Sequence, residues 1–284
     1  MPWWIDERCI MKLSIITVNL NNCDGLQKTI DSVVSQTFKD FEWIVIDGGS
    51  TDGSKELIEQ YADHFIYWVS EPDKGIYNAM NKGIRVAKGD YLQFLNSGDY
   101  LYDRTTLEKC LLPQNNADVI YGNLYLTDSG TSQLRTHPDK LTLRFFLNDT
   151  LCHNATFIKR DIIQQVYYNE HNKLVSDWEF FLSQAIKNKT FSHINEPVIY
   201  YDMQGISSSS QQIVEEERQQ VIAKTYPQML LEDYKQMYQL EVKLDNSQVK
   251  QVIIYQNKKK LYRKLITACL MLINFIDKHF GKNQ

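Results

Sequence analysis

Apolar and polar residues alternate regularly through the first hundred residues. Short runs rich in β-branched and aromatic residues predict buried strands at 12–18, 42–46, 65–69 and 91–95. Apolar residues that recur every three or four positions predict helices at 24–36, 51–61 and 76–87. This order predicts a parallel sheet covered by helices, with right-handed crossovers.

The pattern is less regular after Asp103. Strands are predicted at 119–126 and 191–201, and helices at 141–147 and 177–186. A serine-rich stretch at 205–212 predicts a mobile loop, and a helical region follows. We therefore expect three parts: an N-terminal extension (1–11), one α/β domain (12–212) and a helical C-terminal extension (213–284).

Polar residues stand where the predicted strands end. Asn19, Asp47, Asp73 and Asp99 lie at or just after these ends. Because ligands of parallel sheets bind beyond the carboxyl ends of the strands, we expect the four side chains to converge on one edge. Two of the strands end in small residues and an Asp, which indicates a nucleotide and a metal ion held at that edge.

The bulk composition narrows the class of protein. A chain of 284 residues with 43% apolar content can bury a sizeable core, and its net charge of -4 offers no broad basic surface for nucleic acid. The five cysteines are scattered without C-x-x-C spacing, which argues against a zinc site or a disulfide framework. Reduced thiols, and an N-terminus without the features of a signal peptide, lead us to expect a cytoplasmic protein.

The C-terminal segment combines a basic stretch with an apolar one. Residues 257–264 are rich in lysine, and an apolar run of about twelve residues follows at 265–276. Spanning a bilayer needs ~20 apolar residues, so this run does not cross. Two alternatives stay open: a helix packed on the domain, or an interfacial helix at 258–280 that contacts the inner face of the cell membrane.

Several motifs follow one another in a fixed order. They are Ser14–Asn21, Gln36–Phe38, Phe41-Glu42, Ile46–Gly53, Asn81–Ile84, Ala87–Asp90 and Phe94–Asp99. Their order and spacing resemble the family 2 glycosyltransferases, which have the GT-A fold: a mixed, mainly parallel sheet flanked by helices. The segment Glu71–Asn81 is similar to a subgroup involved in bacterial polysaccharide assembly.

The resemblance implies an inverting glycosyltransferase. It would move a sugar from a nucleotide-diphosphate sugar, with a UDP-sugar favoured, to a saccharide or lipid-linked saccharide acceptor. The setting would be the assembly of capsule, exopolysaccharide or O-antigen. Charge builds on the leaving diphosphate, so Mn²⁺ or Mg²⁺ is implied as a Lewis acid.

The resemblance also assigns residues to the sugar donor and the metal ion. The nucleotide sugar would contact Thr17, Val18, Asn19, Asp47, Lys74, Gly75, Asn78, Asn96 and Ser97. Asp99 would bind the metal ion; its structural alternative is a turn residue after a strand. Two carboxylates common in relatives are replaced here, by Gly48 and Gly98. Asp47 has its own alternative, as a loop residue that accepts backbone N–H bonds.

On the acceptor side, Asp177 would be the catalytic base at the start of a helix, with Ser176 where relatives commonly have Glu. Its alternative is a plain helix-start residue, and Glu179 is the substitute candidate. His153 and Trp178 would bind the acceptor, Trp178 by stacking on a sugar.

Two other functions have to be weighed. A nucleotidyltransferase would need a basic, glycine-rich phosphate loop, and residues 19–25 contain no Lys or Arg. A catalytically inactive nucleotide- or saccharide-binding partner protein is favoured by the lost carboxylates at Gly48, Gly98 and Ser176. The sequence also leaves open whether the protein forms a homodimer.

Overall fold

The computed structural model describes most of the chain. The described residues are 13–111, 115–128, 130–203 and 210–245, together with 264, 265, 267–269, 271 and 272. The chain divides into two compact units, Met1–Gln219 and Gln220–Gln284. The predicted extension at 1–11 and most of the predicted serine-rich loop lie outside the described residues.

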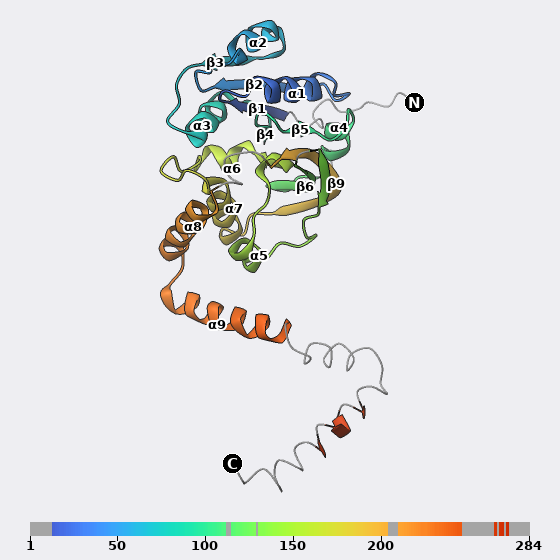
Figure 1. The fold of residues 1–284 in the computed structure, drawn as a ribbon, viewed down its shortest axis with the longest axis vertical. Coiled ribbons are helices and arrows are strands. Elements are labelled where there is room, and N and C mark those ends of the chain that lie inside the picture. The colour runs from blue at the N-terminus through green and yellow to red at the C-terminus, as the bar shows by residue number, and fades with distance from the viewer. Residues whose placement is uncertain are drawn as a thin grey trace, which may run out of the picture. The chain divides into compact units, whose positions relative to one another are not determined.

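The first half alternates strand and helix as predicted (Figure 1). The strands are β1 (Leu13–Asn19), β2 (Phe41–Asp47), β3 (Tyr67–Ser70) and β4 (Tyr91–Phe94). The helices are α1 (Cys23–Val34), α2 (Ser54–Gln60) and α3 (Ile76–Val86), with a 3₁₀ turn at Ala62–His64. β1 pairs in parallel with both β2 and β4, and β2 pairs in parallel with β3. The carboxyl ends of these strands therefore meet at one edge.

The second half extends the same sheet. Its strands are β5 (Tyr100–Leu101), β6 (Val119–Asp128), β7 (Thr131–Arg135), β8 (Thr156–Lys159) and β9 (Phe191–Asp202). Its helices are α4 (Thr106–Cys110), α5 (Leu143–Asn148), α6 (Arg160–Gln164) and α7 (Ser176–Ile186), with a 3₁₀ turn at His153–Ala155. The strand order is β3-β2-β1-β4-β8-β6-β9-β5, and β7 pairs with β6. The short strands β5, β7 and β8 were not predicted.

β1 lies in the core, and its sequence is mainly apolar and β-branched. All seven of its residues are buried, because both faces of the strand are covered. Ile15 belongs to the cluster that includes Leu26 and Ile30 of α1. On the opposite face, a Cβ at Gly83 of α3 would stand 2.5 Å from the side chain of Ile16, so this helix packs closely on the strand. This two-sided packing fixes the position of the polar strand end at Asn19.

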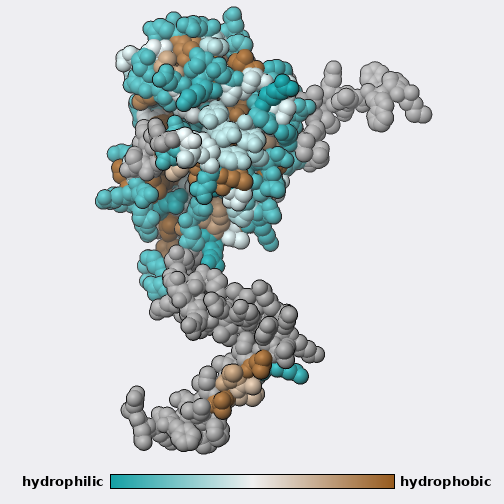
Figure 2. Space-filling view, turned by 45° about the vertical axis from the view of Figure 1, so that its right-hand side comes forward, coloured by the Kyte–Doolittle hydropathy of each residue, from teal (hydrophilic) through white to brown (hydrophobic). Residues whose placement is uncertain are grey.

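The C-terminal region is helical where the structure describes it. α8 (Gln211–Thr225) crosses the limit between the two units, and α9 (Gln228–Asp245) belongs to the second. No helix among the described residues is long and apolar enough to span a membrane. The described residues within 264–272 expose Leu265, Met271 and Leu272, and Figure 2 shows apolar side chains there between grey ones. Most of the predicted interfacial helix lies outside the described residues.

Candidate active site

Asp47 organises the carboxyl end of β2. The parallel register sets it opposite Asn19 of β1 and Ser70 of β3. Its carboxylate accepts hydrogen bonds from Asn19 Nδ2 at 2.7 Å, from Ser70 Oγ at 2.6 Å and from the Ser50 backbone N–H at 2.9 Å. The Ser50 hydroxyl and the Gly49 N–H also donate to it.

These hydrogen bonds decide the charge of Asp47. Burial alone would raise its pKa, but the donors from Ser50, Ser70 and Asn19 outweigh burial and lower the pKa below the ordinary value. The side chain is fully buried and its oxygens are engaged within the protein. Asp47 therefore holds the 48–50 turn in place in this structure, which corresponds to its structural alternative. Direct contact with a nucleotide stays a prediction.

Gly48 leaves room for a different carboxylate. A Cβ built at Gly48 would stand 3.3 Å from Asp73 Oδ2 and 3.1 Å from the side chain of Leu20. Asp73 in turn forms an ion pair with Lys82 at 2.5 Å. A carboxylate thus lies beside the position where the family resemblance implies a second Asp, although it comes from the loop after β3.

Strand β1 contributes mainly backbone carbonyl groups to the edge where the strands end. Thr17 is buried, and its Oγ1 accepts a bond from Trp43 Nε1 at 3.0 Å, so its side chain belongs to the core. The Val18 carbonyl accepts the Ser97 N–H at 3.0 Å, and the Asn19 carbonyl accepts the Gly48 N–H at 2.8 Å. The structure therefore brings Val18, Asn19 and Ser97 together and directs the Thr17 side chain elsewhere.

Asp99 lies behind this edge. It is 5% exposed; one oxygen accepts from Asn154 Nδ2 and the other from the Asp202 N–H at 2.8 Å. Burial raises its pKa to about 7 against the opposing effect of these hydrogen bonds and of His153. The Gly98 backbone before it has φ of +103°, a conformation that an Asp at this position would adopt only with strain.

The metal ion predicted at Asp99 was tested against these contacts. Mn²⁺ and Mg²⁺ bind ionised carboxylate oxygens that solvent and substrate can reach. Asp99 is buried and accepts a hydrogen bond on each oxygen, so its arrangement here does not fit a metal ligand. Among the described residues, no group of three or more His, Cys, Asp or Glu side chains could hold a metal ion. Metal binding by Asp99 stays a prediction.

A hydrogen-bonded chain of four side chains joins the two halves of the sheet domain. Tyr77 of α3 donates its hydroxyl to Asp177 Oδ1 at 2.7 Å. Asp177 Oδ2 lies 3.0 Å from His153 Nδ1, and His153 Nε2 lies 3.3 Å from Asn96 Nδ2. Asn96 stands just past β4, so this chain reaches from the start of α7 to the predicted sugar-donor edge.

The charges in this chain are also set by its contacts. Burial alone would raise the pKa of Asp177, but the hydrogen bond and charge of His153, together with the Tyr77 hydroxyl, lower the pKa below its ordinary value. Burial, followed by the neighbouring Asp177, raises the pKa of Tyr77 well above its usual range. An ionised Asp177 beside a neutral Tyr77 is the expected state at pH 7.

A small cavity adjoins Tyr77 on the α3 side. Its volume is about 90 Å³, and its lining includes the predicted sugar-donor residues Lys74, Gly75 and Asn78. Asn78 Oδ1 accepts the Lys74 N–H at 3.3 Å, while Asn78 Nδ2 donates to Glu170 at 2.8 Å. The structure thus gathers these three residues at one opening next to the hydrogen-bonded chain.

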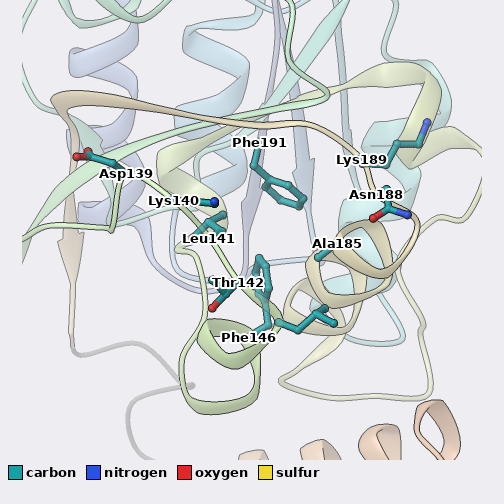
Figure 3. A pocket seen from close by; sticks show the side chains of 10 residues that line it. Asp139, Lys140, Leu141, Thr142, Phe146, Ala185, Asn188, Lys189 and Phe191 are labelled. Carbon is teal, nitrogen blue, oxygen red and sulfur yellow. The ribbon is translucent and has the colours of Figure 1, made fainter.

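A larger cavity of about 310 Å³ contains none of the predicted site residues (Figure 3). Its lining comes from residues 139–142, α5, the end of α7 with the loop after it, and the start of β9, and the rings of Phe146 and Phe191 are part of it. We place the site at the strand ends despite the greater volume here, because the buried polar side chains converge there.

Trp178 requires a correction. It is 1% exposed, its Nε1 donates to the Phe146 carbonyl at 2.6 Å, and the Arg218 guanidinium lies 5.0 Å from its ring centroid. A sugar has no access to this ring, so the predicted stacking does not fit. Trp178 follows Asp177 on the helix and packs inward.

Sequence reasoning missed Tyr77, Asn154, Ser50 and Ser70 as partners of the predicted carboxylates. Tyr77 belongs to the Glu71–Asn81 motif, which was the available signal. Asn154 follows His153 directly and could have been considered with it. The two serines carry no distinguishing pattern, because serine is common in turns.

Comparison with known proteins identifies the family of this chain. The family model "Glycosyl transferase family 2" matches residues 14–173. A PGL/p-HBAD biosynthesis glycosyltransferase of Mycobacterium tuberculosis is 30% identical over 59% of this chain and 67% of its own length. An uncharacterized glycosyltransferase of the same species is 34% identical over 61% of this chain and 69% of its own.

Solved structures share the fold at low identity. S. aureus TarS 1–349 in complex with UDP-GlcNAc has a TM-score of 0.62 and 18% identity, over 89% of this chain and 78% of that one. The Pyrobaculum calidifontis mannosyltransferase PcManGT, in complex with GDP-Man and Mn²⁺, has a TM-score of 0.58 and 14% identity, over 96% and 82%. The family resemblance and the fold class are confirmed: this chain belongs to glycosyl transferase family 2 and is a glycosyltransferase of the GT-A fold.

Proposed function

We propose that this protein transfers a sugar, with inversion, from a nucleotide-diphosphate sugar to a saccharide or lipid-linked saccharide acceptor. The observation that carries the proposal is the hydrogen-bonded chain from Asn96 to Tyr77, which sets an ionised carboxylate and an imidazole beside the strand ends. Such a pair can remove the proton of an acceptor hydroxyl next to a bound sugar donor. A single attack by that hydroxyl inverts the anomeric carbon.

The identity of the sugar donor is proposed from the relatives. The solved neighbours were captured with UDP, UDP-GlcNAc or GDP-Man, and we favour a UDP-sugar. Lys74 and Asn78 at the small cavity suit the diphosphate and the sugar, because Lys supplies a positive charge and Asn supplies both donor and acceptor atoms.

The biological setting is proposed in the same way. The name of the mycobacterial relative refers to PGL/p-HBAD biosynthesis, which supports a role in glycan assembly. We propose assembly of capsule, exopolysaccharide or O-antigen, on the cytoplasmic side of the cell membrane. A lipid-linked acceptor would explain a peripheral contact through residues 258–280.

We propose a divalent cation that the protein itself holds only weakly. PcManGT was solved with Mn²⁺, but both oxygens of Asp99, the predicted metal ligand, accept hydrogen bonds from protein groups. We therefore expect the diphosphate itself to hold most of the cation. Removal of Mn²⁺ with EDTA should weaken nucleotide binding modestly rather than abolish it.

The first experiment measures thermal stabilisation by UDP, GDP, dTDP and CMP, each with Mn²⁺ and with EDTA. One nucleotide at 100 times its dissociation constant should stabilise the fold by about 2.7 kcal/mol, or roughly 5–10 °C in melting temperature. Lys74→Ala should weaken that binding about tenfold. Lys55→Ala, which removes only an exposed pair with Glu59, is the control and should bind as wild type does.

Two outcomes would count against the proposal. The absence of stabilisation by all four nucleotides would contradict the predicted sugar-donor site. Stabilisation without nucleotide release from UDP-glucose, UDP-GlcNAc or GDP-mannose, in the presence of saccharide acceptors, would favour the inactive binding protein instead.

A further inference from the structure

Helix α8 contacts the chain on both sides of Asp177, the predicted catalytic base. On the N-terminal side, the Glu217 carboxylate accepts the backbone N–H groups of residues 173 and 174 at 2.7 and 3.0 Å. On the C-terminal side, the Arg218 guanidinium lies 5.0 Å from the ring centroid of Trp178. Two consecutive residues of α8 thus contact the segments that flank the base.

The ring of Trp178 is held by two separate contacts. Its Nε1 donates to the Phe146 carbonyl at 2.6 Å, and the Arg218 guanidinium lies near the ring. Tryptophan is the aromatic side chain that attracts a cation most strongly. Because Trp178 follows Asp177 directly in the first turn of α7, a fixed ring also restrains the backbone that carries the catalytic carboxylate.

The position of this backbone matters for the hydrogen bonds of Asp177. Its two oxygens face Tyr77 of α3 at 2.7 Å and His153 of a 3₁₀ turn at 3.0 Å. Both contacts would lengthen if the first turn of α7 moved away from the sheet. A displacement of about 1 Å can cost about 100-fold in rate, even when its cause lies outside the reacting groups.

Arg218 also brings a positive charge close to the base. Its Nε is buried and has no hydrogen-bond partner among the described residues. Burial lowers the pKa of Arg218, while the charges of Asp177 and Asp149 oppose that effect; the guanidinium stays charged at pH 7. Asp149 already has a partner, since Arg135 lies 2.5 Å from it. The charge of Arg218 therefore favours the ionised form of Asp177 from a longer distance.

We propose that α8 is part of the active site, and that Arg218 is a positioning residue for Asp177, with Glu217 supporting the loop before it. This inference rests on the proposed function, because it concerns the base of that reaction. It places the end of the catalytic part beyond residue 212, where the sequence predicted that the glycosyltransferase domain ends. Arg218 acts on the base and leaves the sugar donor to the residues at the strand ends.

Nucleotide release tests the role of Arg218 in the full chain. The probes are UDP-glucose, UDP-GlcNAc and GDP-mannose with water as acceptor, which avoids the need to know the natural acceptor. Arg218→Met keeps the length of the side chain and removes its charge. We expect it to lower kcat about tenfold while the dissociation constant of the sugar donor changes less than about twofold. Arg218→Lys should recover most of the lost rate, because an ammonium group is also attracted to the ring.

A double variant separates positioning from a general loss of structure. If Arg218 acts through Asp177, Arg218→Met should lower the rate about tenfold in the wild-type background and less than about twofold in Asp177→Asn. An equal fall in both backgrounds would overturn the inference. Lys224→Met, which removes an exposed charge from the same helix, is the matched control and should release nucleotide as wild type does.

The remaining outcomes separate this inference from the proposed function. If Arg218→Met and wild type release nucleotide at the same rate, glycosyl transfer stands and only the role of α8 fails. A donor affinity that falls as much as kcat would also overturn the positioning role, because the residue would then support the fold in general. If the wild type binds a sugar donor and releases no nucleotide under any condition, glycosyl transfer itself is contradicted, and the role of Arg218 fails with it.

Discussion

The carboxylates in this site differ in pKa, because they receive different numbers of hydrogen bonds. Asp47 and Asp177 are buried but receive enough donors to keep their pKa below the ordinary value. Asp99 is equally buried, yet fewer donors reach it, and burial raises its pKa to about 7. The balance between lost hydration and gained hydrogen bonds therefore determines which carboxylates stay charged.

The raised pKa of Asp99 has a consequence for stability. A carboxyl that titrates near 7 when folded and near 3.9 when unfolded binds more protons in the folded state, so its contribution to stability falls as pH rises through that window. Asp99→Asn removes this penalty. As the pH rises from 5 to 8, we expect the free energy of unfolding of Asp99→Asn to increase by roughly 2–3 kcal/mol relative to that of the wild type.

Urea denaturation at the two pH values measures this gain, with the exposed Asp63→Asn as control. An equal difference between wild type and Asp99→Asn at pH 5 and pH 8 would contradict the raised pKa. If Asp99 nevertheless holds a cation, the same variant will lose the Mn²⁺ dependence of nucleotide binding.

At the scale of elements, the alternation of strand and helix was enough to predict that the polar strand ends meet at one edge of the sheet. Parallel pairing of β1, β2 and β4 brings residues such as Asn19 and Asp47 to one edge, and this follows from local patterns alone. The partners do not follow, because Tyr77 and Asp177 are 100 positions apart in sequence and meet only through packing. Trp178 was misplaced because periodicity does not say which side of α7 faces the core.

Helix α8 holds the loop that precedes α7. Glu217 accepts the backbone N–H groups of Lys173 at 2.7 Å and Leu174 at 3.0 Å. Glu217→Gln would weaken both bonds, since bonds to a charged acceptor are about twice as strong as neutral ones. We expect amide exchange at residues 173 and 174 to accelerate about tenfold, for a loss of roughly 1.4 kcal/mol in local stability.

The neighbouring Glu216→Gln is the matched control, because the hydrogen bond that Glu216 accepts from the described residues comes from the exposed Gln212 side chain at 2.9 Å. Hydrogen exchange followed by mass spectrometry compares the two variants. Equal protection of residues 173 and 174 in both would show that Glu217 does not fix this loop.

The whole molecule combines an α/β unit with a helical unit whose lysine-rich segment lies mainly outside the described residues. If that segment binds anionic lipid, each lysine contributes about 1 kcal/mol at the membrane surface. Replacement of Lys258, Lys259 and Lys260 by Ala in the full chain should therefore weaken binding to vesicles with 30% phosphatidylglycerol about 100-fold. Binding to pure phosphatidylcholine vesicles is the control.

Vesicle sedimentation measures this binding. Unchanged sedimentation of the triple variant, or equal binding to neutral and anionic vesicles, would contradict the interfacial helix. It would favour the alternative in which this segment packs on protein.

Gly98 has a consequence for protein engineering of the site. Its backbone has φ of +103°, and Asn22 Nδ2 would stand only 3.2 Å from a Cβ built there. An Asp at this position would therefore meet strain of roughly 1–2 kcal/mol before any bound metal ion could offset it. A second carboxylate would be introduced into this site at lower cost from another position than from 98.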